Sequence, residues 1–247
     1  MDLQGKSAII TGGGTGLGRS ISLQLAREGV NLAINYSRSV EDAEKTAEEA
    51  RELGVKAFAI KADVSVPESA ENLVLEAAKA LGGLDLLINN AGTTKFSSFR
   101  DLGSLEVNDF LDLFKTNAMS IFSTARAAEK IMKKQGWGHI INTLSISGLV
   151  PIGSSMAYAV SKAAGVHLTK CLAVALAPEI KVNAVAPGLL LTRWSSGYSE
   201  EVIAKSKKKA RLHKTTDLEE CASMYIGIAK NDSITGQIIT VDAGLTV

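Results

Sequence analysis

Ser145, Tyr158 and Lys162 are three polar residues whose spacing, S-(12 residues)-Y-x-x-x-K, suits proton transfer. A tyrosine hydroxyl is a poor acid–base catalyst at neutral pH because its ordinary pKa is about 10, and a fixed positive charge nearby favours the tyrosinate. Lys162 follows Tyr158 by one helical turn, so both side chains lie on one helix face and can reach the same ligand. The pattern predicts acid–base chemistry at Tyr158, with Lys162 supplying the charge.

A glycine-rich turn near the start of the chain reads T-G-G-G-T-G-L-G over residues 11–18. It follows an apolar run at 7–11 and precedes a helical pattern, so its backbone N–H groups and the positive helix end can face a pyrophosphate. Its G-x-x-x-G-x-G spacing differs from the G-x-G-x-x-G fingerprint of other dinucleotide-binding enzymes, and such a turn can also serve tight packing alone. Combined with the tyrosine pattern, it indicates carbonyl–alcohol chemistry on a nicotinamide cofactor.

The end of the second expected strand distinguishes NAD from NADP. An acidic side chain there binds the ribose 2′-hydroxyl and repels a 2′-phosphate. The chain has no acid in this stretch before Glu41, and Arg38 lies between Ser37 and Ser39. Arginine pairs with a phosphate dianion, and the two serine hydroxyls are added donors. NADP(H) is therefore the predicted cofactor; the alternative is that Arg38 is a solvated loop residue.

Short β-rich runs alternate with longer helical patterns, which is typical of a parallel sheet covered on both faces. The expected strands are 7–11, 31–36, 57–63, 84–89, 139–143, 181–186 and 238–241. Beyond the helix that follows the glycine turn, the expected helices are 41–53, 67–81, 110–134, 158–176 and 218–230. This order predicts an α/β fold in which one domain, 1–247, holds a doubly wound parallel sheet of about seven strands with right-handed crossovers.

The bulk composition disfavours several classes of function. Lys and Arg number 27 against 26 Asp and Glu, so no global field points to nucleic acid or an anionic membrane. No charged leader with a long apolar run opens the chain, and no apolar stretch approaches the roughly 20 residues of a membrane span. Cys171 and Cys221 have neither metal-ligand nor disulfide spacing and are expected to be buried in helices. We expect a cytoplasmic protein with a small-molecule partner and no metal.

Seven motifs occur in one order along the sequence. They are T-G-x-x-x-G-x-G at 11–18, Asp63, N-N-A-G at 89–92, Asn117, Ser145, the Tyr158–Lys162 pair, and P-G-x-x-x-T at 187–192. Each has a plain structural explanation when taken alone, but the ordered set is highly specific. On these motifs the chain resembles the single-domain type of the short-chain dehydrogenase/reductase family over nearly its whole length. The resemblance implies a Rossmann fold.

The resemblance implies a role for each polar residue of the site. Tyr158 donates a proton to the substrate carbonyl oxygen while a hydride passes from the nicotinamide to the carbonyl carbon. Lys162 favours the tyrosinate and binds the nicotinamide ribose, and Ser145 holds the oxygen as it becomes an alkoxide. Asn117 supports the helix near Lys162 and a water relay. Ser147 is a rival to Ser145, but only Ser145 has the family's separation from Tyr158.

The resemblance also implies the cofactor contacts. Asp63 contacts the adenine, Asn90 and Gly92 line the cofactor, Thr192 reaches its carboxamide, and Gly188 permits the turn beneath the nicotinamide. The full set of expected cofactor-binding residues is Gly12, Thr15, Gly16, Leu17, Gly18, Ser37, Arg38, Ser39, Asp63, Val64, Asn90, Ala91, Gly92, Tyr158, Lys162, Pro187, Gly188 and Thr192.

Substrate selection in such folds lies beyond the carboxyl ends of the strands, here at 93–99, 147–156 and a lid at about 189–215. A loop this long after a strand is usually functional. These segments carry side chains that suit a hydrophobic or aromatic ketone, namely Val150, Pro151, Met156, Leu189, Trp194 and Tyr198. Packing of a mobile lid is nearly as good an explanation for the two aromatic residues, and core packing for Met156.

A basic run at 205–214 holds six basic residues and no acid. Such a patch can dock an acidic acyl carrier protein, as in the 3-oxoacyl carrier-protein reductases of the family, or can be a solvated helix face. The arginines expected for carrier docking are replaced here by Glu129 and Pro178. The leading hypothesis is therefore an NADPH-dependent carbonyl reductase, reversible as an alcohol dehydrogenase, that acts on a small or medium-sized lipophilic substrate. A 3-oxoacyl carrier-protein reductase ranks second, and a non-catalytic NADP(H)-sensing binding protein third.

Family resemblance also implies a homotetramer, or a homodimer, assembled through the long helices that begin near residues 110 and 158. The first of these helices is rich in alanine, which allows close helix approach. Packing of that helix on its own sheet is the alternative.

Overall fold

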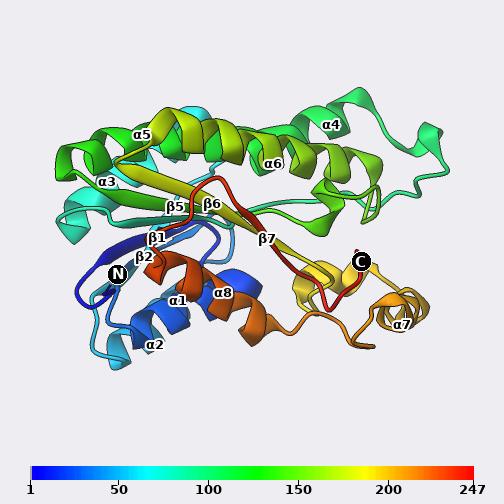
Figure 1. Cartoon of the computed structure of the whole chain (residues 1–247), viewed down its shortest axis with the longest axis horizontal. Helices are drawn as coiled ribbons and strands as arrows, with labels where there is room; N and C mark the ends of the chain where they lie inside the picture. The colour runs from blue at the N-terminus through cyan, green and yellow to red at the C-terminus, as the bar shows by residue number, and fades with distance from the viewer. Residues whose placement is uncertain (1) are drawn as a thin grey trace.

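Seven parallel strands form one sheet in the computed structural model, which describes residues 2–247 (Figure 1). They are β1 (Ser7–Ile10), β2 (Asn31–Tyr36), β3 (Ala57–Lys61), β4 (Leu86–Asn89), β5 (Gly138–Thr143), β6 (Ile180–Pro187) and β7 (Ile238–Val241). Their order is β3-β2-β1-β4-β5-β6-β7, and each neighbouring pair is parallel. The strand order reverses between β1 and β4, where doubly wound sheets bind ligands beyond the strand ends. The predicted doubly wound α/β fold is confirmed.

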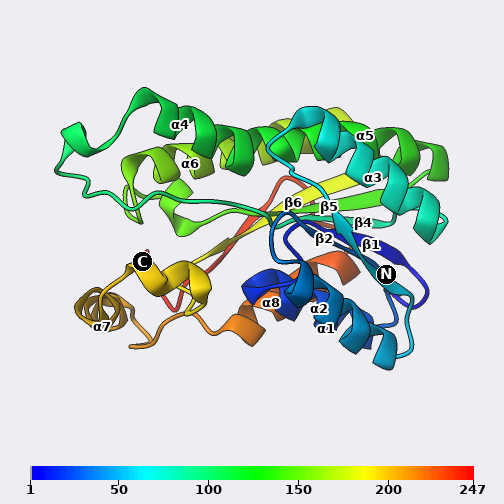
Figure 2. The same cartoon turned by 180° about the vertical axis from the view of Figure 1, so that it is seen from behind.

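Helices cover both faces of the sheet (Figures 1 and 2). One face carries α1 (Gly16–Arg27), α2 (Val40–Glu52) and α8 (Leu218–Lys230). The other face carries α3 (Pro67–Leu81), α4 (Val107–Phe114), α5 (Ser120–Gln135) and α6 (Met156–Leu176). The remaining helix, α7 (Glu200–Lys209), stands at one end of the molecule beside the C-terminus.

The core is divided between the two faces of the sheet because side chains alternate along each strand. In β1, Ala8 and Ile10 pack in the apolar cluster that contains the buried residues of α1 and α8. Ile9 points to the other face and joins the cluster built with α3, α5 and α6. All three side chains are fully buried, so the central strand is held rigidly from both sides. The strand ends that carry the glycine turn are thereby fixed.

Local signals set the ends of two helices as the sequence predicts. Pro67 occupies the first turn of α3, where its missing N–H costs nothing, and Gly82 ends the helix in the left-handed conformation at φ +83°. At the start of α8 the Asp217 carboxylate accepts a hydrogen bond of 2.9 Å from the Glu220 backbone N–H. The bounds of both helices agree with the predicted 67–81 and 218–230.

The expected single helix over 110–134 is wrong. The helical region begins earlier than predicted, with α4 at Val107, where the Glu106 and Asp109 side chains form a capping box. It is then interrupted by a π-helical turn, η2 (Lys115–Met119), before α5 continues. A π-turn inserts one extra residue per turn and has no strong sequence signal, and such turns are frequent at functional sites.

Two smaller expectations are also wrong. Cys171 is exposed on α6, whereas Cys221 is buried as predicted. The α6 helix has 21 residues and an 18-residue window with a mean hydropathy of 1.3, so it is long and apolar enough by length and composition to span a membrane. It packs against β6 and contributes buried side chains to the core, as the central helix of a globular fold does.

Candidate active site

A cavity of about 930 Å³ opens at the carboxyl ends of the strands and contains most of the predicted site. It is lined by the predicted residues Gly12, Thr15, Gly16, Leu17, Gly18, Ser37, Arg38, Ser39, Asn90, Ala91, Gly92, Ser145, Tyr158, Lys162, Pro187, Gly188 and Thr192. A neighbouring cavity of about 270 Å³ is lined by Asp63 and Val64 and shares Arg38 with the first. The structure thus brings the expected cofactor residues together along one continuous wall; their binding roles stay predictions.

The glycine turn is shaped to let a ligand approach the backbone. A Cβ atom at Gly18 would collide with the Gly12 carbonyl, and Gly16 adopts φ +50°, a region that disfavours other residues. The Thr11 hydroxyl accepts hydrogen bonds of 2.9 Å from the backbone N–H groups of both Asn90 and Ala91. This clamps the turn to the end of β4. The residues fit a dinucleotide, because a cradle without Cβ atoms at a helix N-terminus suits a pyrophosphate.

Asn35 is a functional residue that sequence reasoning missed. Its side chain is buried at the end of β2, where Oδ1 accepts a 3.3 Å hydrogen bond from the Gly12 N–H. Its Nδ2 donates to the carbonyl of Ala62 at 3.1 Å and to that of Ile60 at 3.3 Å. One amide therefore ties the glycine turn to two neighbouring strands. The available signal was a lone polar residue near the end of an apolar run.

The environment of Arg38 agrees with the predicted phosphate contact. Arg38 lines both cavities, and it lies two residues before α2, whose positive end adds to the local potential. Asp63 lines the smaller cavity with Arg38 and accepts hydrogen bonds from the Ser65 hydroxyl at 2.7 Å and the Ser65 N–H at 2.9 Å. These bonds, with a smaller contribution from Arg38, hold the pKa of Asp63 below its usual range. The Asp63 carboxylate is thus ionised at neutral pH, and the hydrogen bonds from Ser65 stabilise its charge.

Tyr158 and Lys162 project from α6 into the cavity and are nearly buried, at 8% and 3% exposure. The Ser155 hydroxyl caps the helix by accepting a 3.2 Å hydrogen bond from the Tyr158 N–H. The Lys162 ammonium donates to the Thr143 carbonyl at 2.9 Å and lies 5.8 Å from the centre of the Tyr158 ring. The helical spacing has therefore placed both side chains at the same point, as predicted.

Ser145 and Tyr158 line the same cavity, and the interaction of Ser145 with the tyrosine opposes the effect of burial on the tyrosine pKa. Its hydroxyl accepts a 3.1 Å hydrogen bond from the Ser147 N–H and donates to the Ser147 hydroxyl at 3.2 Å. Ser147 also lines the cavity, and it is more deeply buried than Ser145. The rival Ser147 therefore orients Ser145 through these hydrogen bonds, and Ser145 is the serine that influences the pKa of Tyr158.

The electrostatics of the pair differ from the expectation based on the sequence. Burial raises the pKa of Tyr158, and the interaction with Ser145 opposes this shift. Burial also lowers the pKa of Lys162 to about 8. Both shifts have the sign expected when a charged form loses contact with water. Two strongly perturbed groups in one cleft are a mark of a functional site.

Asn117 lies behind the cavity wall, in the π-helical turn η2. Its Oδ1 accepts from the Thr93 N–H at 2.9 Å, and its Nδ2 donates to the Thr93 carbonyl at 2.9 Å and to the Ser161 hydroxyl at 3.0 Å. Ser161 precedes Lys162 on α6. The amide thus joins the loop after β4 to the helix that carries the lysine, while its role in a water relay stays a prediction.

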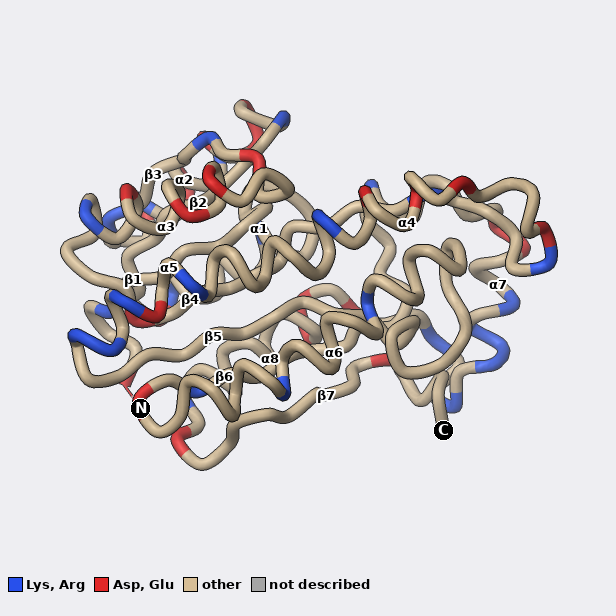
Figure 3. Tube along the Cα trace, turned by 90° about the horizontal axis from the view of Figure 1, so that it is seen from above, with Lys and Arg blue, Asp and Glu red and all other residues tan. Residues whose placement is uncertain are grey.

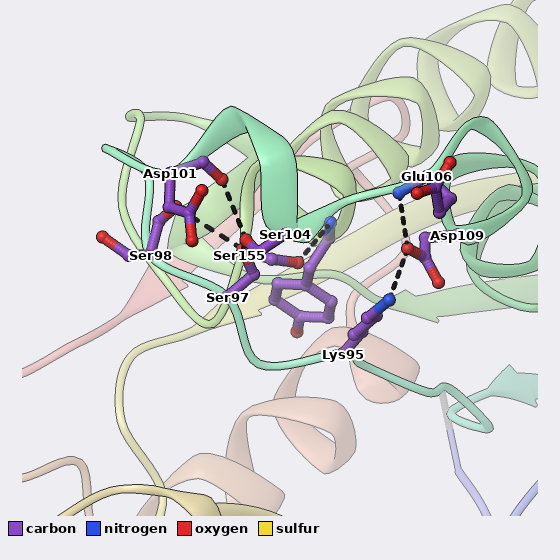
Figure 4. Close-up of polar contacts among 9 residues, drawn as sticks. Lys95, Ser97, Ser98, Asp101, Ser104, Glu106, Asp109 and Ser155 are labelled. Atoms are coloured by element: carbon purple, nitrogen blue, oxygen red, sulfur yellow. Dashed lines mark hydrogen bonds and ion pairs between the residues drawn. The ribbon is translucent and has the colours of Figure 1, made fainter.

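The loop between β4 and α4 is braced by its own polar side chains (Figure 4). Lys95 pairs with Asp109 at 2.6 Å, and the Asp109 carboxylate also accepts from the Glu106 N–H at 2.8 Å. The Ser97 N–H donates to the Ser154 carbonyl at 2.8 Å. The loop is thereby fixed against the start of α6, directly before the residue that caps the Tyr158 helix. Sequence reasoning did not find this brace.

The predicted lid folds into two helical pieces, the 3₁₀ turn η4 (Arg193–Gly197) and α7. The Trp194 ring lies 6.0 Å from that of Tyr158, and Tyr198 packs edge-on against Phe96 at 5.0 Å. Of the apolar residues proposed for the substrate pocket, Val150, Leu189, Trp194 and Tyr198 line the cavity. Pro151 and Met156 are not on its wall, and Ile152 occupies the corresponding place.

Comparison with known proteins agrees with the geometry of the site. A model of the short chain dehydrogenase family matches residues 6–202. The 3-oxoacyl-[acyl-carrier-protein] reductase FabG of Staphylococcus aureus is 37% identical over 244 residues, which cover 97% of this chain and 98% of the relative.

Two solved structures extend the comparison. The NADPH-dependent 3-quinuclidinone reductase of Rhodotorula rubra has a TM-score of 0.92 at 30% identity, with 99% of this chain and 92% of that one covered. A short chain dehydrogenase from Burkholderia cenocepacia in complex with NADP has a TM-score of 0.91 at 31% identity, with 100% of both chains covered. The chain therefore belongs to the short-chain dehydrogenase/reductase family and is an oxidoreductase that acts on CH–OH and carbonyl groups.

Proposed function

We propose that this protein reduces the carbonyl group of a small or medium-sized lipophilic substrate with NADPH, and catalyses the reverse oxidation. The observation that carries the proposal is the meeting of Ser145, Tyr158 and Lys162 on one cavity, between the glycine turn and an apolar wall. The wall carries Trp194, whose ring lies beside that of Tyr158. A ketone on this wall would present its oxygen to the tyrosine.

A bound nicotinamide supplies the hydride, and the residues of the chain handle the oxygen and the proton. Ser145 donates a hydrogen bond to the carbonyl oxygen, which gains negative charge as the bond to hydrogen forms at carbon. Tyr158 then gives its proton to that oxygen. The Tyr158 hydroxyl is protonated at neutral pH, as a proton donor must be, because even the ordinary tyrosine pKa of about 10 lies well above that pH. The Lys162 ammonium stabilises the tyrosinate that remains.

NADPH is the proposed cofactor because of the charges at the end of β2. Arg38 stands between two serine hydroxyls, and the stretch 35–39 holds no carboxylate to repel a 2′-phosphate. A guanidinium can form two parallel hydrogen bonds to a phosphate, which a ribose hydroxyl cannot accept in the same way. Comparing the rates of NADPH and NADH oxidation with one ketone tests both the reaction class and the cofactor.

A 3-oxoacyl carrier-protein reductase is the second candidate function, favoured by the activity named for the Staphylococcus aureus relative. The position expected to carry a docking arginine holds Glu129, which pairs with Lys133 at 2.8 Å. An acidic residue there would repel an acidic carrier protein. Saturable reduction of a 3-oxoacyl carrier protein, with a lower KM than for the matching free ketone, would reverse the ranking.

We further propose that the protein is cytoplasmic and that its copies associate with one another. Large apolar side chains remain exposed on α4, α5 and α6, including Leu111, Phe122, Val160 and Val174. Exposed apolar surface of this kind suits contact between copies of a chain. We infer a homotetramer or homodimer built on these helices, and light scattering at working concentration tests it, because a monomer would contradict the inference.

A further inference from the structure

One face of α7 forms part of the main cavity. The residues of that helix on the cavity wall are Val202, Lys205, Ser206 and Lys209. Their spacing of three, four and seven residues from Val202 is that of one helical face. Lys207 and Lys208 belong to the same basic run but are not on the wall. The basic run is therefore divided into lysines that face the cavity and lysines that do not.

Residues of the lid connect the neighbourhood of Tyr158 to the two cavity lysines along the sequence. Trp194 contacts the Tyr158 ring, Tyr198 follows one 3₁₀ turn later, and Val202 begins the α7 face. With a rise of about 1.5 Å per residue, Lys205 lies about 4 to 5 Å, and Lys209 about 10 Å, beyond Val202 along the helix axis. The wall is thus apolar near the tyrosine and basic at its far end.

These lysines do not lie at the phosphate end of the predicted cofactor site. Arg38 precedes α2, and Figures 1 and 2 show α7 at one end of the molecule beside the C-terminus, apart from α2. Figure 3 shows the blue of Lys and Arg gathered along α7 at that far end. A ligand group that reaches them must extend away from the glycine turn, on the substrate side of Tyr158.

Within the described part of the chain the two cavity lysines have no ion pair of their own, although Val247, whose main-chain oxygen accepts a 3.3 Å hydrogen bond from Arg211, also lies on the cavity wall. Over residues 2–247 neither Lys205 nor Lys209 has an ion-pair partner, whereas Lys214 pairs with Glu220 at 3.1 Å. Like charges four residues apart on a helix repel each other, and an anion between them would remove that repulsion. Lysines in the last turn of a helix also interact favourably with the negative end of its dipole. Lys207 and Lys208 make this interaction without facing the cavity. The orientation of the other two therefore needs a separate explanation.

We propose that the substrate carries an anionic group, a carboxylate or a phosphate, at the end of its lipophilic body remote from the carbonyl, and that Lys205 and Lys209 bind it. This inference rests on the proposed carbonyl reductase function and narrows its substrate class. The apolar wall holds the body, and the two ammonium groups fix its length and direction. They act as specificity residues and take no part in proton transfer.

A pair of ketones that differ only in charge tests the inference. The probes are 5-oxo-5-phenylpentanoate and its primary amide, reduced with NADPH. Replacing both lysines, Lys205→Gln with Lys209→Gln, is expected to raise the ratio of the acid's KM to the amide's KM about tenfold, as loss of two exposed charge pairs implies. The matched control, Lys207→Gln with Lys208→Gln, removes the same charge from the same helix and should leave the ratio within about twofold.

A second measurement does not depend on turnover. Calorimetric binding of 5-oxo-5-phenylpentanoate to the Tyr158→Phe protein with NADP⁺ should weaken by the same factor when the two cavity lysines are replaced, and should weaken with added salt. If the wild type reduces neither ketone but this binding still depends on Lys205 and Lys209, the reductase proposal fails and the anion site stands. If both ketones are reduced and neither measurement responds to the lysines, a carboxylate is ruled out as the anionic group and the reductase stands; if the reduction of acetoacetyl-coenzyme A does not respond to the lysines either, the anion site is refuted.

Acetoacetyl-coenzyme A, whose anionic groups are phosphates, separates the two sources of the charge. A KM for this thioester that rises in the Lys205→Gln, Lys209→Gln protein while the acid is unaffected would assign the site to a phosphate. Equal responses to this double variant and to the Lys207→Gln, Lys208→Gln control would show a general effect of net charge and would overturn the proposal for both probes.

Discussion

Arg193 of the lid and Asp42 of α2 form a bidentate ion pair, with N–O distances of 2.9 and 2.7 Å. The two residues are 151 positions apart in the chain, and Arg193 lies on the wall of the main cavity together with the residues of the glycine turn. The hydrogen bond from Arg193 holds the pKa of Asp42 below its usual range. Thr192, next to Arg193, packs against the position of Gly16. The lid is thereby fastened over the predicted cofactor site.

Breaking this pair should loosen the lid. Asp42→Asn keeps the shape of the side chain but removes its charge, and we expect the rate of NADP⁺ release to rise about two- to fivefold, as for an exposed pair. Stopped-flow measurement of cofactor fluorescence or protein quenching gives this rate. Asp112→Asn, which removes an exposed pair with Lys115 away from the lid, is the control. Equal rates in the two variants would show that the pair does not restrain the lid.

Arg38 should decide the choice of cofactor. Arg38→Asp removes the phosphate partner and adds a charge that repels a 2′-phosphate, so the KM for NADPH should rise about 10- to 100-fold. The KM for NADH should change by much less. Arg27→Asp makes the same change of charge at the far end of α1 and serves as the control. Equal effects of Arg38→Asp on both cofactors would contradict the assignment.

Lys162 should set the upper pH limit of ketone reduction. Its pKa is lowered to about 8 by burial, so the ammonium that stabilises the tyrosinate is lost as the pH rises through that value. The rate of reduction at saturating substrate should therefore fall above about pH 8. In Lys162→Arg the charge persists to much higher pH, so whatever activity remains should lack this decline. A rate that falls at the same pH in both proteins would assign the decline to another group.

His139 should make the fold sensitive to acid. Its side chain is buried at the amino end of β5, where Nε2 contacts the Asn183 amide at 2.9 Å and Nδ1 has no hydrogen-bond partner among residues 2–247. Burial, together with the Lys181 charge, lowers its pKa to about 3. The unfolded chain, with a histidine pKa of about 6.5, binds the additional proton over the range between these values.

The free energy of unfolding should therefore fall as the pH drops below about 6.5, with a contribution from this residue of about 1.4 kcal/mol per pH unit. Urea unfolding of His139→Gln between pH 7 and pH 5 should show a slope shallower by that amount. His167→Gln, at an exposed histidine on α6, is the control. An unchanged slope in His139→Gln would show that other groups cause the acid sensitivity.

Local patterns explain why much of the site was predictable from the sequence. Residues four apart on a helix lie on the same face, so the spacing of Tyr158 and Lys162 predicts that their side chains meet. A glycine-rich turn between a strand and a helix predicts a site for an anionic group at the helix N-terminus. The parallel order of the strands then brings their carboxyl ends to one edge, where Ser145 and Gly188 also lie.

Contacts between distant segments explain what was not predictable. The pairing of Arg193 with Asp42, and the anchoring of the glycine turn by Asn35, depend on how loops meet after the sheet has formed. The π-helical turn at Asn117 arises where the amide must reach both Thr93 and Ser161. The direction of the Tyr158 pKa shift depends on burial, and a motif carries no information about burial.

Turnover that depends on the Tyr158 hydroxyl is the most direct test of the central claim. NADPH oxidation at 340 nm with 5-oxo-5-phenylpentanoate and its amide would be compared in the wild type, Tyr158→Phe and Tyr198→Phe, with the alcohol product identified by mass spectrometry. Tyr198 lines the same cavity. We predict that Tyr158→Phe lowers kcat at least about 100-fold, while Tyr198→Phe keeps more than about a tenth of it. Equal activity in the wild type and Tyr158→Phe would contradict the account.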